Sequence, residues 1–273
     1  MAQTMKREPV SGTAVTPPSK KRKQPFLVDF YSTAVGKKYV MAITGLIGIG
    51  FVITHMIGNL KLYLGVVSEA NGERIYDADV YGEFLRELLV PIFPRTVFLW
   101  ILRIVLIAAV VLHIHAASGL TRMNHHARAV KYQSARDYQV ANFASRTMRW
   151  TGTIVALFIV WHLADLTWGF VHSDHVVGAV YYNVSESLSR LPVALIYIVG
   201  NLALGVHLFH GTWSLFQSMG WNNPRFNSWR RYAAIGTATI VVAGNLSFPI
   251  ATMAGIIDYD PSAVTHPVGE ESK

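Results

Sequence analysis

The chain contains no cysteine, and only 15% of its 273 residues are charged. The absence of cysteine excludes disulfide bonds, thiolate-held iron–sulfur clusters, cysteine zinc sites and thioether-attached c-type haem. Soluble domains usually carry about 25% charged residues. Apolar side chains replace that charge here and make up 52% of the sequence. This composition argues against a water-soluble enzyme, and the 11 histidines are left as the only strong nitrogen ligands.

The apolar residues are gathered in runs of roughly 20 or more residues, long enough to cross a hydrocarbon layer of about 30 Å. The sequence therefore predicts an all-α membrane protein, a five-transmembrane-helix bundle over residues 31–257. Residues 1–30 are predicted to form a disordered basic tail, and residues 258–273 a short tail on the other side. The five predicted spans are Tyr39–Tyr63, Val97–Thr121, Trp150–Val171, Pro192–Met219 and Tyr232–Ile257.

Lysine and arginine are distributed unevenly between the two sides of the predicted membrane. Seventeen of the 24 lie in the N-terminal tail and in the loops 122–149 and 220–231. Because positively charged loops remain on the inner side, we expect a cytoplasmic N-terminus and an outer C-terminus in a bacterial plasma (inner) membrane. The net charge of +8 then reflects topology. We expect no nucleic-acid partner, and the basic tail is predicted to contact anionic membrane lipid.

Histidines occur inside four consecutive predicted spans, where an ionisable residue is costly and suggests a functional site. They are His55 in the first span, His113 and His115 in the second, His162 in the third, and His207 and His210 in the fourth. With a rise of about 1.5 Å per residue, His55 and His162 lie toward the outer side. His115 and His207 lie toward the cytoplasmic side. The spacing predicts two stacked bis-histidine sites.

Haem b suits these sites better than zinc does. Zinc favours a compact tetrahedron, usually with carboxylates or thiolates nearby, and the only carboxylate in a predicted span is Asp165. Depth does not identify every ligand. His113 and His115 lie about 200° apart around their helix, so only one of them can face a haem. His207 and His210 lie about 60° apart, so both could approach one ring.

The spans carry motifs that are specific to one family. These motifs are Gly36-Lys37-Lys38, Met41-Ala42-Ile43-Thr44-Gly45, His55-Met56-Ile57-Gly58-Asn59, His115-Ala116-Ala117-Ser118-Gly119, Trp161-His162 and Tyr197-Ile198-Val199-Gly200. With them the chain resembles the cytochrome b membrane anchor of succinate dehydrogenase/fumarate reductase, in the class with five helices and two haems b. The resemblance implies His55 and His162 as ligands of the distal haem, and His115 and His207 as ligands of the proximal one. It leaves His113 and His210 as hydrogen-bonding neighbours.

The resemblance implies a function in electron transfer. A flavoprotein subunit with FAD would oxidise succinate, and an iron–sulfur subunit would pass the electrons to this chain and on to quinone, with menaquinone favoured. Because haems stacked across the membrane serve a reaction in the outer half, we expect quinone near the outer ends of spans 1 to 3. Its expected polar contacts are Lys61, Asp165 and His172. No predicted span contains glutamate, and Arg103 is expected to pair with a distal haem propionate.

Two other functions are compatible with the histidine pattern. One is a di-haem b anchor of another oxidoreductase, such as a formate dehydrogenase or a hydrogenase, which shares the haem chemistry but not the quoted motifs. The other is a transporter that uses histidines for protons or metal. Such a transporter would lack the Soret absorbance that haem gives, so an absorption spectrum separates it from the two haem proteins.

Overall fold

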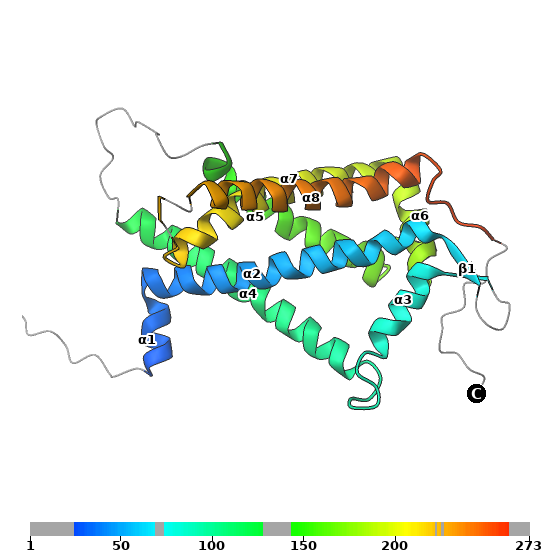
Figure 1. The fold of residues 1–273 in the computed structure, drawn as a ribbon, viewed down its shortest axis with the longest axis horizontal. Coiled ribbons are helices and arrows are strands. Elements are labelled where there is room, and N and C mark those ends of the chain that lie inside the picture. The colour runs from blue at the N-terminus through cyan, green and yellow to red at the C-terminus, as the bar shows by residue number, and fades with distance from the viewer. Residues whose placement is uncertain (1–24, 69–73, 128–142, 222, 225–226, 262–273) are drawn as a thin grey trace, which may run out of the picture.

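A computed structural model describes residues 25–68, 74–127, 143–221, 223–224 and 227–261 of the chain (Figure 1). Five helices in this part are long and apolar enough to cross a membrane, which confirms the predicted spans to within a few residues at most ends. The five are α2 (Ala34–Asn59) with its 3₁₀ extension η1 (Leu60–Leu64), α4 (Val97–His126), α5 (Phe143–His162) with its π-helical extension η2 (Leu163–Thr167), α7 (Leu191–Ser218) and α8 (Asn227–Met253).

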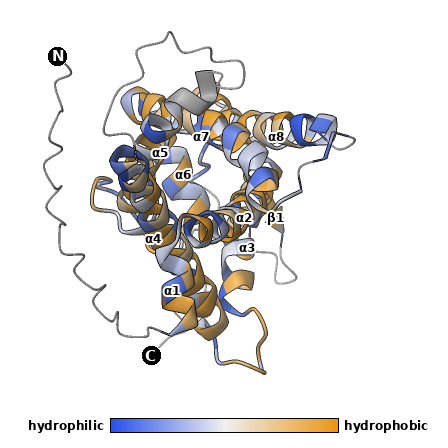
Figure 2. Ribbon diagram, turned by 90° about the vertical axis from the view of Figure 1, so that its left-hand side faces the viewer, coloured by the Kyte–Doolittle hydropathy of each residue, from blue (hydrophilic) through white to orange (hydrophobic). Residues whose placement is uncertain are grey.

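The spans do not all pack against one another. Helix α4 packs on α2, α5 packs on α7, and α7 packs along α8, while α2 joins the two groups by its contacts with α7 and α8. Figure 2 views this bundle from the end at which α1 lies and shows apolar residues distributed over the spans. Many large apolar side chains on the spans are exposed, among them Ile104, Leu157 and Val199. Such an apolar surface is suited to contact with lipid, whereas a soluble protein rarely exposes large contiguous apolar patches.

Helix α1 (Phe26–Ser32) lies across one end of the bundle, beside the start of α2 (Figure 1). The Thr33 hydroxyl accepts a hydrogen bond from Gly36 N at 2.9 Å and so caps the start of α2. The sequence predicted disorder as far as residue 30, whereas residues 26–30 are helical here. Four large apolar residues in this segment favour order at an interface over a solvated coil. The rest of the predicted tail lies outside the described residues.

Short elements close the opposite end of the bundle. The strands β1 (Val66–Ser68) and β2 (Arg74–Tyr76) pair antiparallel, and α3 (Asp77–Arg86) and α6 (Val180–Ser189) lie beside them. The rings of Tyr76 and Tyr181 stack with their centroids 3.8 Å apart, and Asp79 accepts a hydrogen bond from Tyr181 N at 2.9 Å. Burial raises the pKa of Asp79. These contacts join the loop after the first span to the loop before the fourth, and hold that end together.

Candidate functional site

His55 on α2 and His162 on α5 form the first histidine pair. Their ring centroids lie 5.8 Å apart and the ring planes are inclined by 81°. Metal–imidazole bonds are about 2.0–2.1 Å long, so two imidazoles on opposite sides of one metal ion have centroids about 6 Å apart. Two rings in direct contact reach similar separations, so distance alone does not identify a metal site. His162 Nδ1 is buried and makes no hydrogen bond within the described part of the chain.

A second pair links α4 to α7. The rings of His113 and His207 have their centroids 6.3 Å apart, with an interplanar angle of 62°. Within the described residues, α4 does not pack along α7, and α2 does not pack along α5. Each histidine pair therefore bridges two helices that other helices hold apart. Such an arrangement has room for a planar group between its two helices, unlike a close helix–helix contact.

The hydrogen bond of His113 indicates which ring nitrogen carries a proton. The Thr44 hydroxyl donates to Val40 O at 2.7 Å and lies 3.0 Å from His113 Nδ1. Because that hydroxyl has a single hydrogen, it accepts the hydrogen bond from His113 Nδ1–H. His113 Nε2 is then left with a free lone pair, which is the state of a metal-ligating imidazole whose other nitrogen is held by a neighbour.

His207 has an equivalent environment on α5. The Thr151 hydroxyl donates to Met148 O at 3.1 Å and lies 3.5 Å from His207 Nδ1. Glycine follows each threonine and lets the ring approach the helix backbone. A Cβ atom on Gly45 would lie 3.5 Å from His113 Cε1, and one on Gly152 would lie 3.2 Å from His207 Cε1.

Room for a planar group remains beside the first pair as well. Gly48 lies two turns before His55 on the same face of α2. A Cβ atom at Gly48 would have no heavy atom within 4 Å. Together with the unpartnered His162 Nδ1 and the helices held apart, this space means that the residues fit a bis-imidazole haem at His55 and His162. At His113 and His207 the fit rests on the separated helices and on the bound Nδ1 atoms.

His115 is not beside His207 in this structure. Its Nδ1 lies 2.5 Å from the hydroxyl of Tyr31 on α1, and the two rings stack with centroids 5.7 Å apart. Lys37 Nζ lies 4.1 Å from the centroid of the Tyr31 ring. Helix α4 is oriented so that His113 faces the bundle. His115 then points away, because two positions along a helix differ by about 200° around its axis. His210, one turn from His207, is half-buried.

The predicted polar contacts of cofactors have other partners. The guanidinium of Arg103 lies 5.0 Å from the centroid of the Trp100 ring, and Arg103 is exposed in the second turn of α4. The end of α4 nearest α3 diverges from α2 (Figure 1). The structure therefore does not bring Arg103 to His55 and His162. Lys61 Nζ forms an ion pair with Asp77 Oδ2 at 2.8 Å, which ties η1 to α3.

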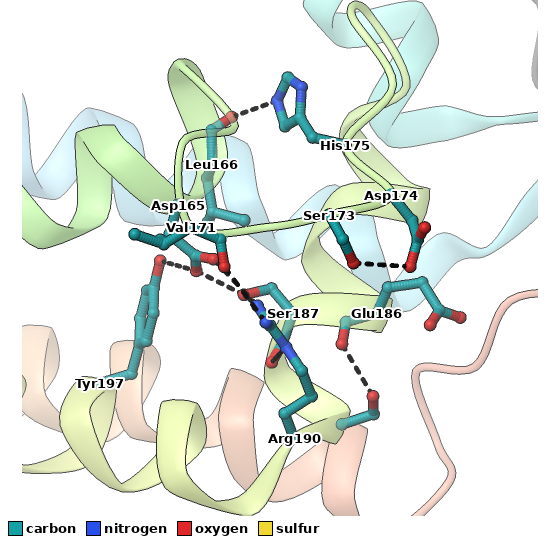
Figure 3. A network of polar contacts seen from close by, with 11 residues as sticks. Asp165, Leu166, Val171, Ser173, Asp174, His175, Glu186, Ser187, Arg190 and Tyr197 are labelled. Carbon is teal, nitrogen blue, oxygen red and sulfur yellow. Dashed lines mark hydrogen bonds and ion pairs between the residues drawn. The ribbon is translucent and has the colours of Figure 1, made fainter.

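Asp165 lies in η2 and is completely buried, at 0% exposed (Figure 3). Its carboxylate accepts a short hydrogen bond from Ser187 Oγ and one of 2.9 Å from Tyr197 OH. Arg190 Nη2 lies 3.1 Å from Asp165 Oδ1 and forms an ion pair with it. We call these four residues the Asp165 cluster; it joins the end of the third span to the start of the fourth.

His172 follows the third span and is also buried. Its Nδ1 makes no hydrogen bond within the described residues, and its ring centroid lies 6.2 Å from that of His175. Burial lowers the pKa of His172, and the nearby positive charge of Arg190 lowers it further. A neutral imidazole with a free ring nitrogen can accept or donate a hydrogen bond at this end of the bundle.

The model of one protein family, described as the succinate dehydrogenase/fumarate reductase transmembrane subunit, matches residues 121–246. This segment belongs to that family. The resemblance inferred from the motifs is thereby confirmed for the part of the transmembrane subunit that contains His162, Asp165 and His207. No curated protein and no solved structure matches the chain. The matched segment begins after His115, so α2 and most of α4 lie outside it.

One sequence signal could have identified the ring partner of His207 in the transmembrane subunit. Both α2 and α5 contain Met-x-x-Thr-Gly followed by histidine: Met41-Ala42-Ile43-Thr44-Gly45 with His55, and Met148-Arg149-Trp150-Thr151-Gly152 with His162. In both helices the histidine comes eleven residues after the threonine. The two threonines contact His113 and His207. The repeat therefore indicates that His113 and His207 occupy equivalent positions beside the two threonines. The angles between residues of a single helix do not contain this information.

Proposed function

We propose that this chain is the di-haem b anchor of a succinate:quinone oxidoreductase, which receives electrons from an iron–sulfur subunit and delivers them to quinone. The observation that carries the proposal is the presence of two histidine pairs, each contributed by two spans that are held apart. On both α2 and α5 the two levels are eleven residues apart, which is about 16 Å along a helix. Two redox centres one above the other suit electron transfer across a membrane.

In this proposal His55 and His162 hold one haem b, and His113 and His207 hold the other. A haem with two imidazole ligands supplies reversible one-electron transfer and has no open position for oxygen. The protein's part is to fix the rings. Thr44 and Thr151 bind Nδ1 of their histidines and leave Nε2 free to ligate. His113 thus takes the place that the family resemblance gave to His115, and His115 holds α1 through Tyr31.

The two ends of the bundle would have different roles. The α1 end, with the basic tail and loops of the sequence, would face the cytoplasm of a bacterial cell and dock the iron–sulfur subunit, which carries the clusters, with the FAD-containing flavoprotein beyond it. Quinone, and menaquinone in particular, would react at the opposite end near His55 and His162. Asp165 is completely buried and already accepts from Ser187, Tyr197 and Arg190, so in this proposal it supports the region without binding quinone. His172, with a free ring nitrogen, is the better contact.

Absorption spectroscopy and haem quantification test the proposal. The purified complex is expected to contain two low-spin haems b per copy of this chain. His113→Ala and His207→Ala are expected to remove the same haem, and His55→Ala and His162→Ala the other. His115→Ala is the matched control, two residues away on α4, and should keep both haems. A chain without Soret absorbance refutes the function. Loss of a haem in His115→Ala but not in His113→Ala refutes the ligand set alone.

A further inference from the structure

The Asp165 cluster contains a carboxylate that nothing in the electron-transfer scheme uses. Asp165 is the only buried acidic residue among the described residues of the spans. An acidic side chain at this depth is costly and is retained where it has a function. It lies in a five-residue π-helical segment, in which Trp168 N bonds Leu163 O at 2.8 Å. Such π-helical turns occur frequently at functional sites.

The cluster is connected to His162 through one aromatic side chain. The hydroxyl of Tyr197 donates to Asp165, and its ring meets the ring of His162 with centroids 5.8 Å apart at 70°. Phe158 packs edge-on against the same Tyr197 ring at 5.3 Å and 90°. Asp165 therefore fixes the hydroxyl of Tyr197, whose ring forms one wall of the His162 site. The hydrogen bond to the carboxylate thus determines where this ring lies.

The two charges of the cluster are unequally screened. Asp165 has none of its side chain exposed, whereas 38% of the Arg190 side chain is exposed. Water weakens the field of the exposed arginine more than that of the buried carboxylate. Arg190 also bonds Ser187 Oγ at 3.2 Å and Val171 O at 3.4 Å, which direct its positive charge toward the end of the bundle. The field at His162 is then dominated by the negative charge.

We propose that Asp165 is a positioning residue that sets the redox potential of the haem held by His55 and His162, through the orientation of Tyr197 and through its own charge. The proposal rests on the function proposed above. A negative charge beside a redox centre favours its oxidised, more positive state. Asp165 thereby lowers the potential of this haem. It affects the pair His113–His207 less, because that pair lies about 16 Å further along the helices and the interaction weakens with distance.

Asp165→Asn in the whole complex tests the proposal by redox titration and electron paramagnetic resonance. The substitution keeps the size of the side chain and removes the charge. The potential of the haem at His55–His162 should shift upward, and its low-spin signal should move with the changed wall, while the other haem keeps both values. Ser187→Ala removes a contact to the same carboxylate but no charge, and should not raise the potential. Asp174→Asn, an exposed carboxylate bonded to Ser173, should change neither haem.

Two outcomes overturn the proposal while leaving the proposed function standing. One is an Asp165→Asn complex with both haems and unchanged potentials. The other is an equal shift of both haems, which indicates a global effect. If Asp165→Asn does not assemble, Tyr197→Phe decides, since it keeps the ring and removes one donor from the carboxylate. A downward shift confined to the haem at His55–His162 supports the proposal, and no shift overturns it. A wild-type complex that lacks this haem refutes the proposed function instead.

Discussion

Replacing Thr44 by valine tests how the protein holds His113. The substitution preserves the shape of the β-branched side chain and removes only the hydroxyl that accepts from His113 Nδ1 at 3.0 Å. The same hydroxyl donates to Val40 O. Its removal leaves the N–H of the His113 ring without this acceptor in a partly buried site. The Met41 backbone then remains as a hydrogen-bond partner of His113, and Nε2 is held less firmly toward the metal position.

The expected magnitude follows from the role of the bond. Loss of a neighbour that orients a ligating histidine typically reduces metal affinity about 10–100-fold, or roughly 1.4–2.7 kcal/mol. The equivalent contact of Thr151 with His207 is longer, at 3.5 Å. A bond at that distance is weak. Thr44→Val should therefore cost more haem affinity at the His113–His207 pair than Thr151→Val does.

The assay is haem retention during purification, quantified by the pyridine haemochrome and by the amplitudes of the two low-spin signals. Thr121→Val is the control, because within the described residues its hydroxyl bonds Ala117 O of its own helix. Haem loss in Thr44→Val that is no greater than in Thr121→Val contradicts the reasoning. Loss of the haem at His55–His162 would do the same, because that pair lies at the other level.

Two further predictions concern the second threonine motif and the placement of quinone. Gly152→Val should displace the ring of His207, whose Cε1 would be 3.2 Å from the new Cβ, and should lower occupancy of that haem by spectroscopy. Gly236→Val, where a Cβ meets no heavy atom within 4 Å, should leave both haems, and equal losses in the two variants would contradict this. Quinone reduction at the end opposite α1 moves electrons across the bilayer, at about 2.3 kcal/mol per charge per 100 mV for a full crossing. Succinate:quinone activity in sealed vesicles should then respond to an uncoupler, and activity indifferent to it argues for quinone at the α1 end.

The sequence by itself determined the membrane-spanning bundle. Runs of apolar residues can satisfy their backbone groups in lipid only as helices, so the five spans were confirmed with small shifts at their ends. The third span was predicted to reach Val171, whereas its helix ends at Thr167. Asp165 binds Ser187 and Arg190 from another part of the chain, and hydropathy along one segment contains no information on such partners.

Tertiary structure decided which histidines meet. The sequence predicted that His55 and His162 share one site, and their rings lie 5.8 Å apart, but the choice between His113 and His115 depends on the rotation of α4 about its axis. That rotation is set by packing on α2, where Thr44 and Gly45 receive His113. The positions of Arg103 and Lys61 also depended on packing, because α4 diverges from α2 at one end and η1 meets α3. The period of a single helix fixes the angle between two of its side chains, and only its neighbours fix which one faces the interior.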